Sequence, residues 1–134
     1  MKNKFLIFIF LIFASISYKA QATDTLSDAK NFETNKANYI GQPFSKLLND
    51  MTQIQPKTIW ATTNFKSKNE VKSSRIKFCD LEESFNVITL EIIWQTPLER
   101  SNTKYYQQLH NAFFTNDEKL FYGSKIVKDI KVYR

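Results

Sequence analysis

Side chains suited to acid–base or nucleophilic chemistry are scarce in this chain of 134 residues. It contains one histidine, His110, and one cysteine, Cys79. A catalytic histidine needs a nucleophile or an orienting carboxylate within hydrogen-bond distance, and the residues around His110 suggest neither. No serine occupies a G-x-S-x-G turn of the hydrolase type. We therefore predict no catalytic residues and expect His110 to lie at a surface or an interface.

Two acidic clusters are the remaining candidates for binding an ion. Asp80, Glu82 and Glu83 form a corner between two expected strands, but they lack the alternating oxygen ligands and the glycine of a calcium loop. Asp117 and Glu118 are explained more simply as helix N-terminal charges stabilised by the helix dipole. One cysteine and one histidine cannot form a zinc cluster, and two glycines cannot form a Gly-rich phosphate loop. We expect no metal and no cofactor.

The N-terminal segment has the layout of a secretory signal peptide. Lysines precede an apolar core at residues 5–16, and small residues stand at Ala20 and Ala22. The core is shorter than the roughly 20 residues that cross a bilayer as a helix. We predict a leader at residues 1–22, cleavage between Ala22 and Thr23, and export to the periplasm or the cell exterior without a membrane span in the mature form.

Loss of the leader weakens the basic character of the chain. The formal charge falls from +6 to +3, because three lysines leave with the leader. The remaining positive charge is spread along the chain without a basic block, so nucleic acid is not an expected partner. Cys79 has no second cysteine to pair with in an oxidising compartment. We expect a partly buried, inert thiol, with an intermolecular disulfide as the alternative.

Helical periodicity marks three main segments of the mature chain. A weak helix is predicted over residues 23–38, and a strong amphipathic helix runs from Phe44 to Thr52 with Pro43 at its first position. A further helix is predicted over residues 103–114, capped by Ser101 or Asn102, and one more turn follows at residues 117–122. The two expected apolar stripes are Phe44, Leu47, Leu48 and Met51 in the strong helix, and Tyr105, Leu109, Ala112 and Phe113 in the later one.

Alternating patterns predict four strands, at residues 57–65, 74–80, 85–95 and 125–133. A polar turn is expected at residues 66–73, and Pro97 is expected to end the third strand. The first three strands then form an antiparallel meander, and the C-terminal strand pairs within the same sheet. The prediction is an α+β fold, with a sheet of about four strands packed with two main helices, in a single small domain at residues 23–134.

Two blocks of sequence resemble small exported Bacteroidota-type proteins of unknown function. Residues 39–48 read Y-I-G-Q-P-F-S-K-L-L and are similar to the Y-I-G-x-P-F-S-x-L-L opening of those proteins. Residues 121–133 are similar to their closing strand. The resemblance implies export and the α+β architecture, and it implies no activity.

The strand parities that place Ile59, Ile76, Ile88 and Ile130 inside the domain leave a second face of the sheet. Interleaved aromatic and cationic side chains are typical of a docking surface. The favoured alternative is that the helix at 103–114 covers this face as a second core layer. The second face is expected to carry Trp60, Arg75, Lys77, Phe85, Val87, Ile93, Val127, Lys131 and Tyr133.

These observations predict an exported, non-enzymatic binding or interaction module of the bacterial cell envelope. Its expected partner is an envelope protein or a cell-wall component, and its candidate binding residues are Trp60, Arg75, Lys77, Phe85, Lys131 and Tyr133. The alternatives are a structural or accessory subunit of an envelope assembly and, least favoured, a small hydrolase-type enzyme.

Overall fold

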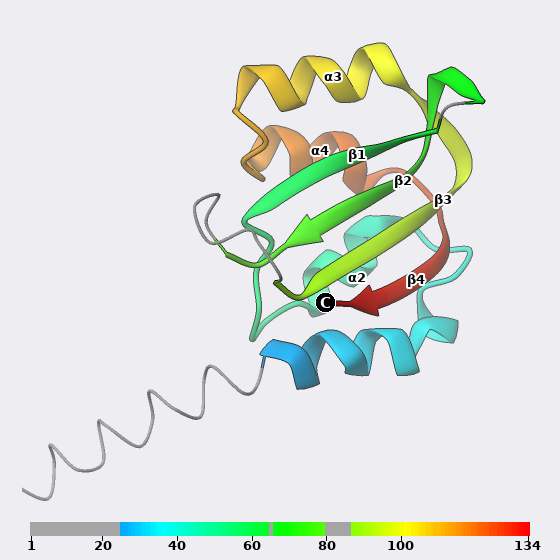
Figure 1. Cartoon of the computed structure of the whole chain (residues 1–134). Coiled ribbons are helices and arrows are strands. Elements are labelled where there is room, and N and C mark those ends of the chain that lie inside the picture. Colours follow the sequence, from blue (N-terminus) through cyan, green and yellow to red (C-terminus); the bar gives the residue numbers. More distant parts are fainter. Residues whose placement is uncertain (1–24, 65, 80–86) are drawn as a thin grey trace, which may run out of the picture.

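Four strands form one antiparallel sheet in a computed structural model that describes residues 25–64, 66–79 and 87–134 (Figure 1). The strand order is β1-β2-β3-β4, so each strand pairs with its neighbour in sequence. The strands are β1 (Thr58–Asn64), β2 (Ser67–Lys77), β3 (Thr89–Glu99) and β4 (Val127–Tyr133). Residues 25–34 are helical, and the later helices are η1 (Lys36–Asn38), α2 (Phe44–Asp50), α3 (Arg100–Leu109) and α4 (Asn116–Gly123). This is the predicted single-domain α+β fold.

One face of the sheet packs against α2 and α4, which lie behind it in Figure 1. Trp94 is at the centre of this core, and its ring lies 5.5 Å from Phe44 of α2 and 5.8 Å from Tyr122 of α4. The Trp94 indole N–H donates to Ser74 Oγ at 3.0 Å, so its polar atom is satisfied inside the core. The predicted stripe of α2 is confirmed, because its four members are all buried: Phe44, Leu47, Leu48 and Met51.

Helix α3 packs on the same side of the sheet, along β1, and not on the second face. Its buried residue Thr103 lines a surface depression together with Ala61, which belongs to the core face of β1. Tyr106 reaches Phe121 of α4, with 4.7 Å between ring centroids. The predicted covering of the second face by this helix is therefore wrong.

The predicted apolar stripe of α3 is mostly wrong, since of its four members only Ala112 is buried and it lies in the link after the helix, and the predicted cap is wrong. Tyr105 and Leu109 are 59% and 54% exposed, because the helix contacts the rest of the domain through its opposite side. The N-cap is Glu99 instead of Ser101 or Asn102, since β3 runs directly into the helix.

The β4 edge of the sheet is covered by segments that precede the sheet in sequence. Gly41, at a positive φ of 78°, donates its N–H to the Val127 carbonyl at 2.8 Å. Nearer the C-terminus, the Glu33 carboxylate accepts from the Val132 N–H at 3.0 Å, and the Lys30 ammonium donates to the Val132 carbonyl at 2.9 Å. Backbone groups that would otherwise present an open edge are thus already paired at these positions.

The β1 edge is covered at its start by the link between α3 and α4. Ile59 donates to the carbonyl of Ala112 and Phe114 donates to the carbonyl of Lys57, both at 2.9 Å. To reach β1, this link places Asn111 and Ala112 at positive φ values of 51° and 63°. An L-residue is disfavoured in that region, so the pairing with β1 and the contacts that follow it must hold the link in place.

Two boundaries within the meander differ from the prediction. The expected polar turn at 66–73 is wrong, because β2 begins at Ser67 and its polar N-terminal half pairs with β1 and β3, with Val71 buried opposite Leu98. Pro97 lies within β3 and does not end it. The last residue of β3 that pairs with β4 is Trp94, so at Pro97 the strand pairs with β2 alone. Proline lacks a backbone N–H and is tolerated in a strand where one side has no pairing partner.

The predicted position of Val127 on the second face is wrong as well. A β-bulge between Ile93 and Trp94 shifts the register of β4, so Val127 is fully buried on the core side. An extra residue in one strand reverses the parity beyond it, which a simple alternation pattern does not detect.

Some predictions fall outside the described residues. They concern the leader at 1–22, the corner of Asp80, Glu82 and Glu83, and the candidate residue Phe85. In the described part of the chain, no helix combines the length and the apolar character needed to cross a membrane.

Candidate functional site

The second face of the sheet carries no described helix or strand in front of it (Figure 1). Three cross-strand rows make up this surface, called here the open face. The central row runs across all four strands as Trp60, Arg75, Glu91 and Lys131. The row on one side includes Thr62, Ser73, Ile93 and Asp129, and the row on the other includes Lys77 and Tyr133. Side chains in adjacent positions of such rows lie within contact distance of one another.

Polar contacts join these rows into a network. Ser73 donates its hydroxyl to Glu91 at 2.6 Å, and Arg75 donates its Nε to the Thr62 hydroxyl at 3.3 Å. Desolvation raises the pKa of Tyr133, and the Glu91 carboxylate beside it raises that pKa further. The Tyr133 phenol therefore stays protonated at neutral pH and can act as a hydrogen-bond donor on this surface.

Positive charge predominates on the open face. Asp129 is paired with Lys36 at 2.7 Å, and this hydrogen bond holds the pKa of the Asp129 carboxyl below its usual range. Glu91 lies between Arg75 and Lys131 in the central row, so one carboxylate is flanked by two cations. The surface is therefore suited to an acidic partner.

Trp60 leaves a polar atom unsatisfied on this face. Its side chain is half-buried, and its Nε1 is shielded from solvent without a hydrogen-bond partner among the described residues. A buried unpaired donor costs about 1–3 kcal/mol. The other tryptophan, Trp94, does have a partner, so the deficit is specific to the open face.

Five of the six predicted binding residues lie together on this face: Trp60, Arg75, Lys77, Lys131 and Tyr133. Arg75, Lys131 and Tyr133 are exposed, and the other two are half-buried. The sixth, Phe85, is outside the described residues. Sequence reasoning missed Glu91, although the same alternation that places Ile93 on this face also places Glu91 there.

His110 lies between two carboxylates that the sequence analysis did not assign to it. Its Nδ1 is 2.6 Å from Oε1 of Glu118, and its Nε2 is 3.4 Å from Oδ2 of Asp117. Glu118 is only 1% exposed and also completes a capping box at the start of α4, where it accepts the Thr115 N–H at 2.8 Å and the Thr115 hydroxyl. The T-x-x-E pattern of residues 115–118 is a recognisable sign of this box.

The cluster of His110, Asp117 and Glu118 has a structural role. Burial acts to raise the pKa of Glu118, but hydrogen bonds from Thr115 and His110 outweigh it and keep that pKa below the ordinary value. An ionised carboxylate only accepts, so His110 Nδ1 carries the proton in this bond. Both ring nitrogens of His110 face carboxylates of its own chain. The cluster joins the end of α3 to the start of α4 and supports the strained link between them.

Other chemistry-bearing groups add little to this surface. Cys79 is half-buried and forms no disulfide within the described residues. Across the same part of the chain, His, Cys, Asp and Glu side chains nowhere gather in a set of three or more that could hold a metal.

Comparison with known proteins gives no family for this chain: no family model matches it, and neither a curated protein nor a solved structure shows significant similarity to it.

Proposed function

We propose that this protein is an exported binding module of the bacterial cell envelope, and that its open face docks an acidic protein surface. The single observation that carries this proposal is the row of Trp60, Arg75, Glu91 and Lys131 across all four strands, which no described helix or strand covers. Export rests on the leader pattern at residues 1–22.

The residue types of the open face favour a protein partner. Tryptophan, tyrosine and arginine supply most binding hot spots, and Trp60, Tyr133 and Arg75 provide one of each on a single face. Their strands fix the backbone at all three positions, so no backbone freedom has to be lost there on binding. The surface is a broad sheet face, which suits a large partner surface better than a small molecule.

Backbone hydrogen bonding at the two edge strands also favours the open face as the docking surface. Val127 and Val132 on β4, and Ile59 on β1, already have hydrogen-bond partners from segments of this chain. Binding by addition of a further strand would need unpaired backbone groups at an edge. The open face needs no such rearrangement, so it is the more accessible docking surface.

Affinity capture from an envelope extract tests the proposal with matched charge reversals. Arg75→Glu and Lys131→Glu place negative charge on the open face. Lys119→Glu makes the same change at an exposed position of α4, away from that face. We expect the first two variants to lose the captured partner and the Lys119→Glu control to keep it. We also expect capture to weaken as salt is raised, because exposed charge pairs are screened.

Two results would overturn the proposal. Capture that survives protease treatment of the extract would identify an acidic polysaccharide as the partner. A stoichiometric complex that persists in Arg75→Glu and Lys131→Glu would favour the accessory-subunit alternative, with its contact elsewhere on the molecule.

A further inference from the structure

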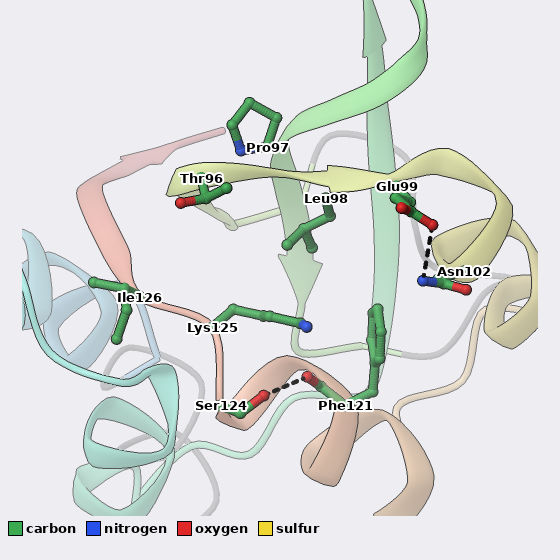
Figure 2. A pocket seen from close by; sticks show the side chains of 9 residues that line it. All are labelled: Thr96, Pro97, Leu98, Glu99, Asn102, Phe121, Ser124, Lys125 and Ile126. Carbon is green, nitrogen blue, oxygen red and sulfur yellow. Dashed lines mark hydrogen bonds between the residues drawn. The ribbon is translucent and has the colours of Figure 1, made fainter.

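A cavity of about 370 Å³ lies where the end of β3 meets the start of α3 and the junction between α4 and β4 (Figure 2). Its volume is at the lower end of the range for small-molecule sites. Leu98 and Ile126 form apolar parts of the lining, and Phe121 of α4 contributes an aromatic ring. The site is formed by two segments that are far apart in sequence, at residues 96–102 and 121–126, and none of its lining residues belongs to the three rows of the open face.

A cation projects into this cavity without a carboxylate partner. The Lys125 side chain is half-buried, and Figure 2 shows its ammonium directed toward Phe121. Its Nζ lies 4.8 Å from the centroid of the Phe121 ring. None of the ion pairs within the described residues involves Lys125. A partly desolvated ammonium in this position is suited to the carboxylate of a ligand.

An anion lies on the β3 side of the same cavity. Glu99 accepts a long hydrogen bond of 3.5 Å from the Asn102 amide, and this is its only hydrogen bond within the described residues. Glu99 and Lys125 both line the cavity, yet they form no ion pair with each other. The cavity therefore offers one positive group and one negative group on an apolar lining.

We propose that this cavity binds a free α-amino acid with an apolar side chain, whose carboxylate meets Lys125 and whose ammonium meets Glu99. A zwitterion satisfies both charges at once, and an apolar side chain covers Phe121 and Leu98. A ligand without the carboxylate leaves the half-buried Lys125 ammonium without a counter-ion, which is unfavourable. A ligand without the ammonium loses the charge-assisted contact with Glu99, whose side chain is exposed at the rim.

Titration of the isotope-labelled mature protein with L-phenylalanine, followed by NMR chemical shifts, tests this proposal. N-acetylphenylalanine lacks the ammonium and phenylalaninamide lacks the carboxylate, and both keep the side chain. We expect L-phenylalanine to shift resonances of the cavity residues and to bind at least about tenfold more tightly than either analogue, since each loses a charge-assisted hydrogen bond.

Two variants assign the charges to their residues. Lys125→Met should abolish the preference for L-phenylalanine over phenylalaninamide, and Glu99→Gln should abolish its preference over N-acetylphenylalanine. Lys128→Met, at an exposed position of β4, is the matched control and should bind as the unmodified protein does. The proposal is overturned if millimolar L-phenylalanine shifts no cavity resonance, if N-acetylphenylalanine binds equally well, or if Lys125→Met leaves the preference intact.

Discussion

The two tryptophans of this chain lie on opposite faces of the same sheet and have opposite environments. Trp94 is 2% exposed, has aromatic neighbours from two helices, and donates its indole N–H to Ser74. Trp60 is half-buried and has three charged residues in its row, and no residue that the structure describes accepts its indole N–H. The face of Trp94 supplies the packing that stabilises the fold. The face of Trp60 instead carries the exposed side chains of Arg75, Lys131 and Tyr133, and it is the surface that we propose for docking.

The largest expected effect is on the packed face. Trp94→Ala should lower the free energy of unfolding by about 3–5 kcal/mol, because it removes a buried aromatic and leaves the Ser74 hydroxyl without its partner. Urea unfolding of the purified protein measures this loss. A loss below about 1 kcal/mol would show that Trp94 is not central to the core.

The next effect concerns the buried carboxylate that supports the link between α3 and α4. Glu118→Gln should cost about 2–3 kcal/mol at neutral pH, because it replaces charge-assisted hydrogen bonds to His110 and Thr115 with neutral ones. The size of the loss follows from urea unfolding at neutral pH. An unchanged free energy of unfolding would show that the capping box does not depend on the charge of Glu118.

The pH dependence of stability separates this charge from packing. The folded pKa of Glu118 lies below its ordinary value of 4.5, so its contribution is complete above pH 4.5 and is lost as pH falls through the folded value. The unmodified protein should therefore lose more stability on acidification than Glu118→Gln does. Parallel pH profiles for the two proteins would contradict this account.

A smaller effect is expected for the tryptophan of the open face. Trp60→Ala should cost about 1 kcal/mol and should abolish partner capture, since the ring is half-buried and lies at one end of the central row. Trp60→Phe keeps a ring and removes the unpaired N–H, so it should leave the urea midpoint unchanged or raise it slightly. A loss above about 3 kcal/mol in Trp60→Ala would mean that this face is part of the core.

The smallest effect on stability is expected at the exposed cation of the same row. Lys131→Ala should change the free energy of unfolding by no more than about 0.5 kcal/mol, because surface charges contribute little to folding. The same variant should weaken partner capture measurably. Equal capture by Lys131→Ala and the unmodified protein would show that Lys131 is not part of the binding surface.

Periodicity in the sequence was enough to predict the parts of the fold that bury a regular apolar pattern. Phe44 and Leu47 repeat at helical spacing, and Ile76 and Leu90 alternate along strands, so α2 and the core face of the sheet are correctly predicted. The same alternation correctly places Arg75 and Lys131 on the other face. These predictions succeed because local spacing determines which face a side chain occupies wherever no bulge interrupts the strand.

Features that depend on tertiary contacts were not predictable in this way. The bulge that buries Val127 arises from pairing between β3 and β4, and the exposure of Tyr105 follows from where α3 meets the sheet. Glu118 could have been recognised as a capping residue from its spacing to Thr115, but its contact with His110 requires the turn between the two helices. No local pattern connects Glu99 with Lys125, which are far apart in sequence and line the same cavity.

Site-specific photo-crosslinking in the envelope of the producing cell tests the central claim most directly. A photoreactive phenylalanine replaces Lys131 on the open face in one strain, and it replaces Lys119 at an exposed position of α4 in another. We predict a single protein adduct from position 131 and none from position 119. An adduct from position 119 with none from position 131 would show that the partner binds the helical side and would contradict the assignment of the open face.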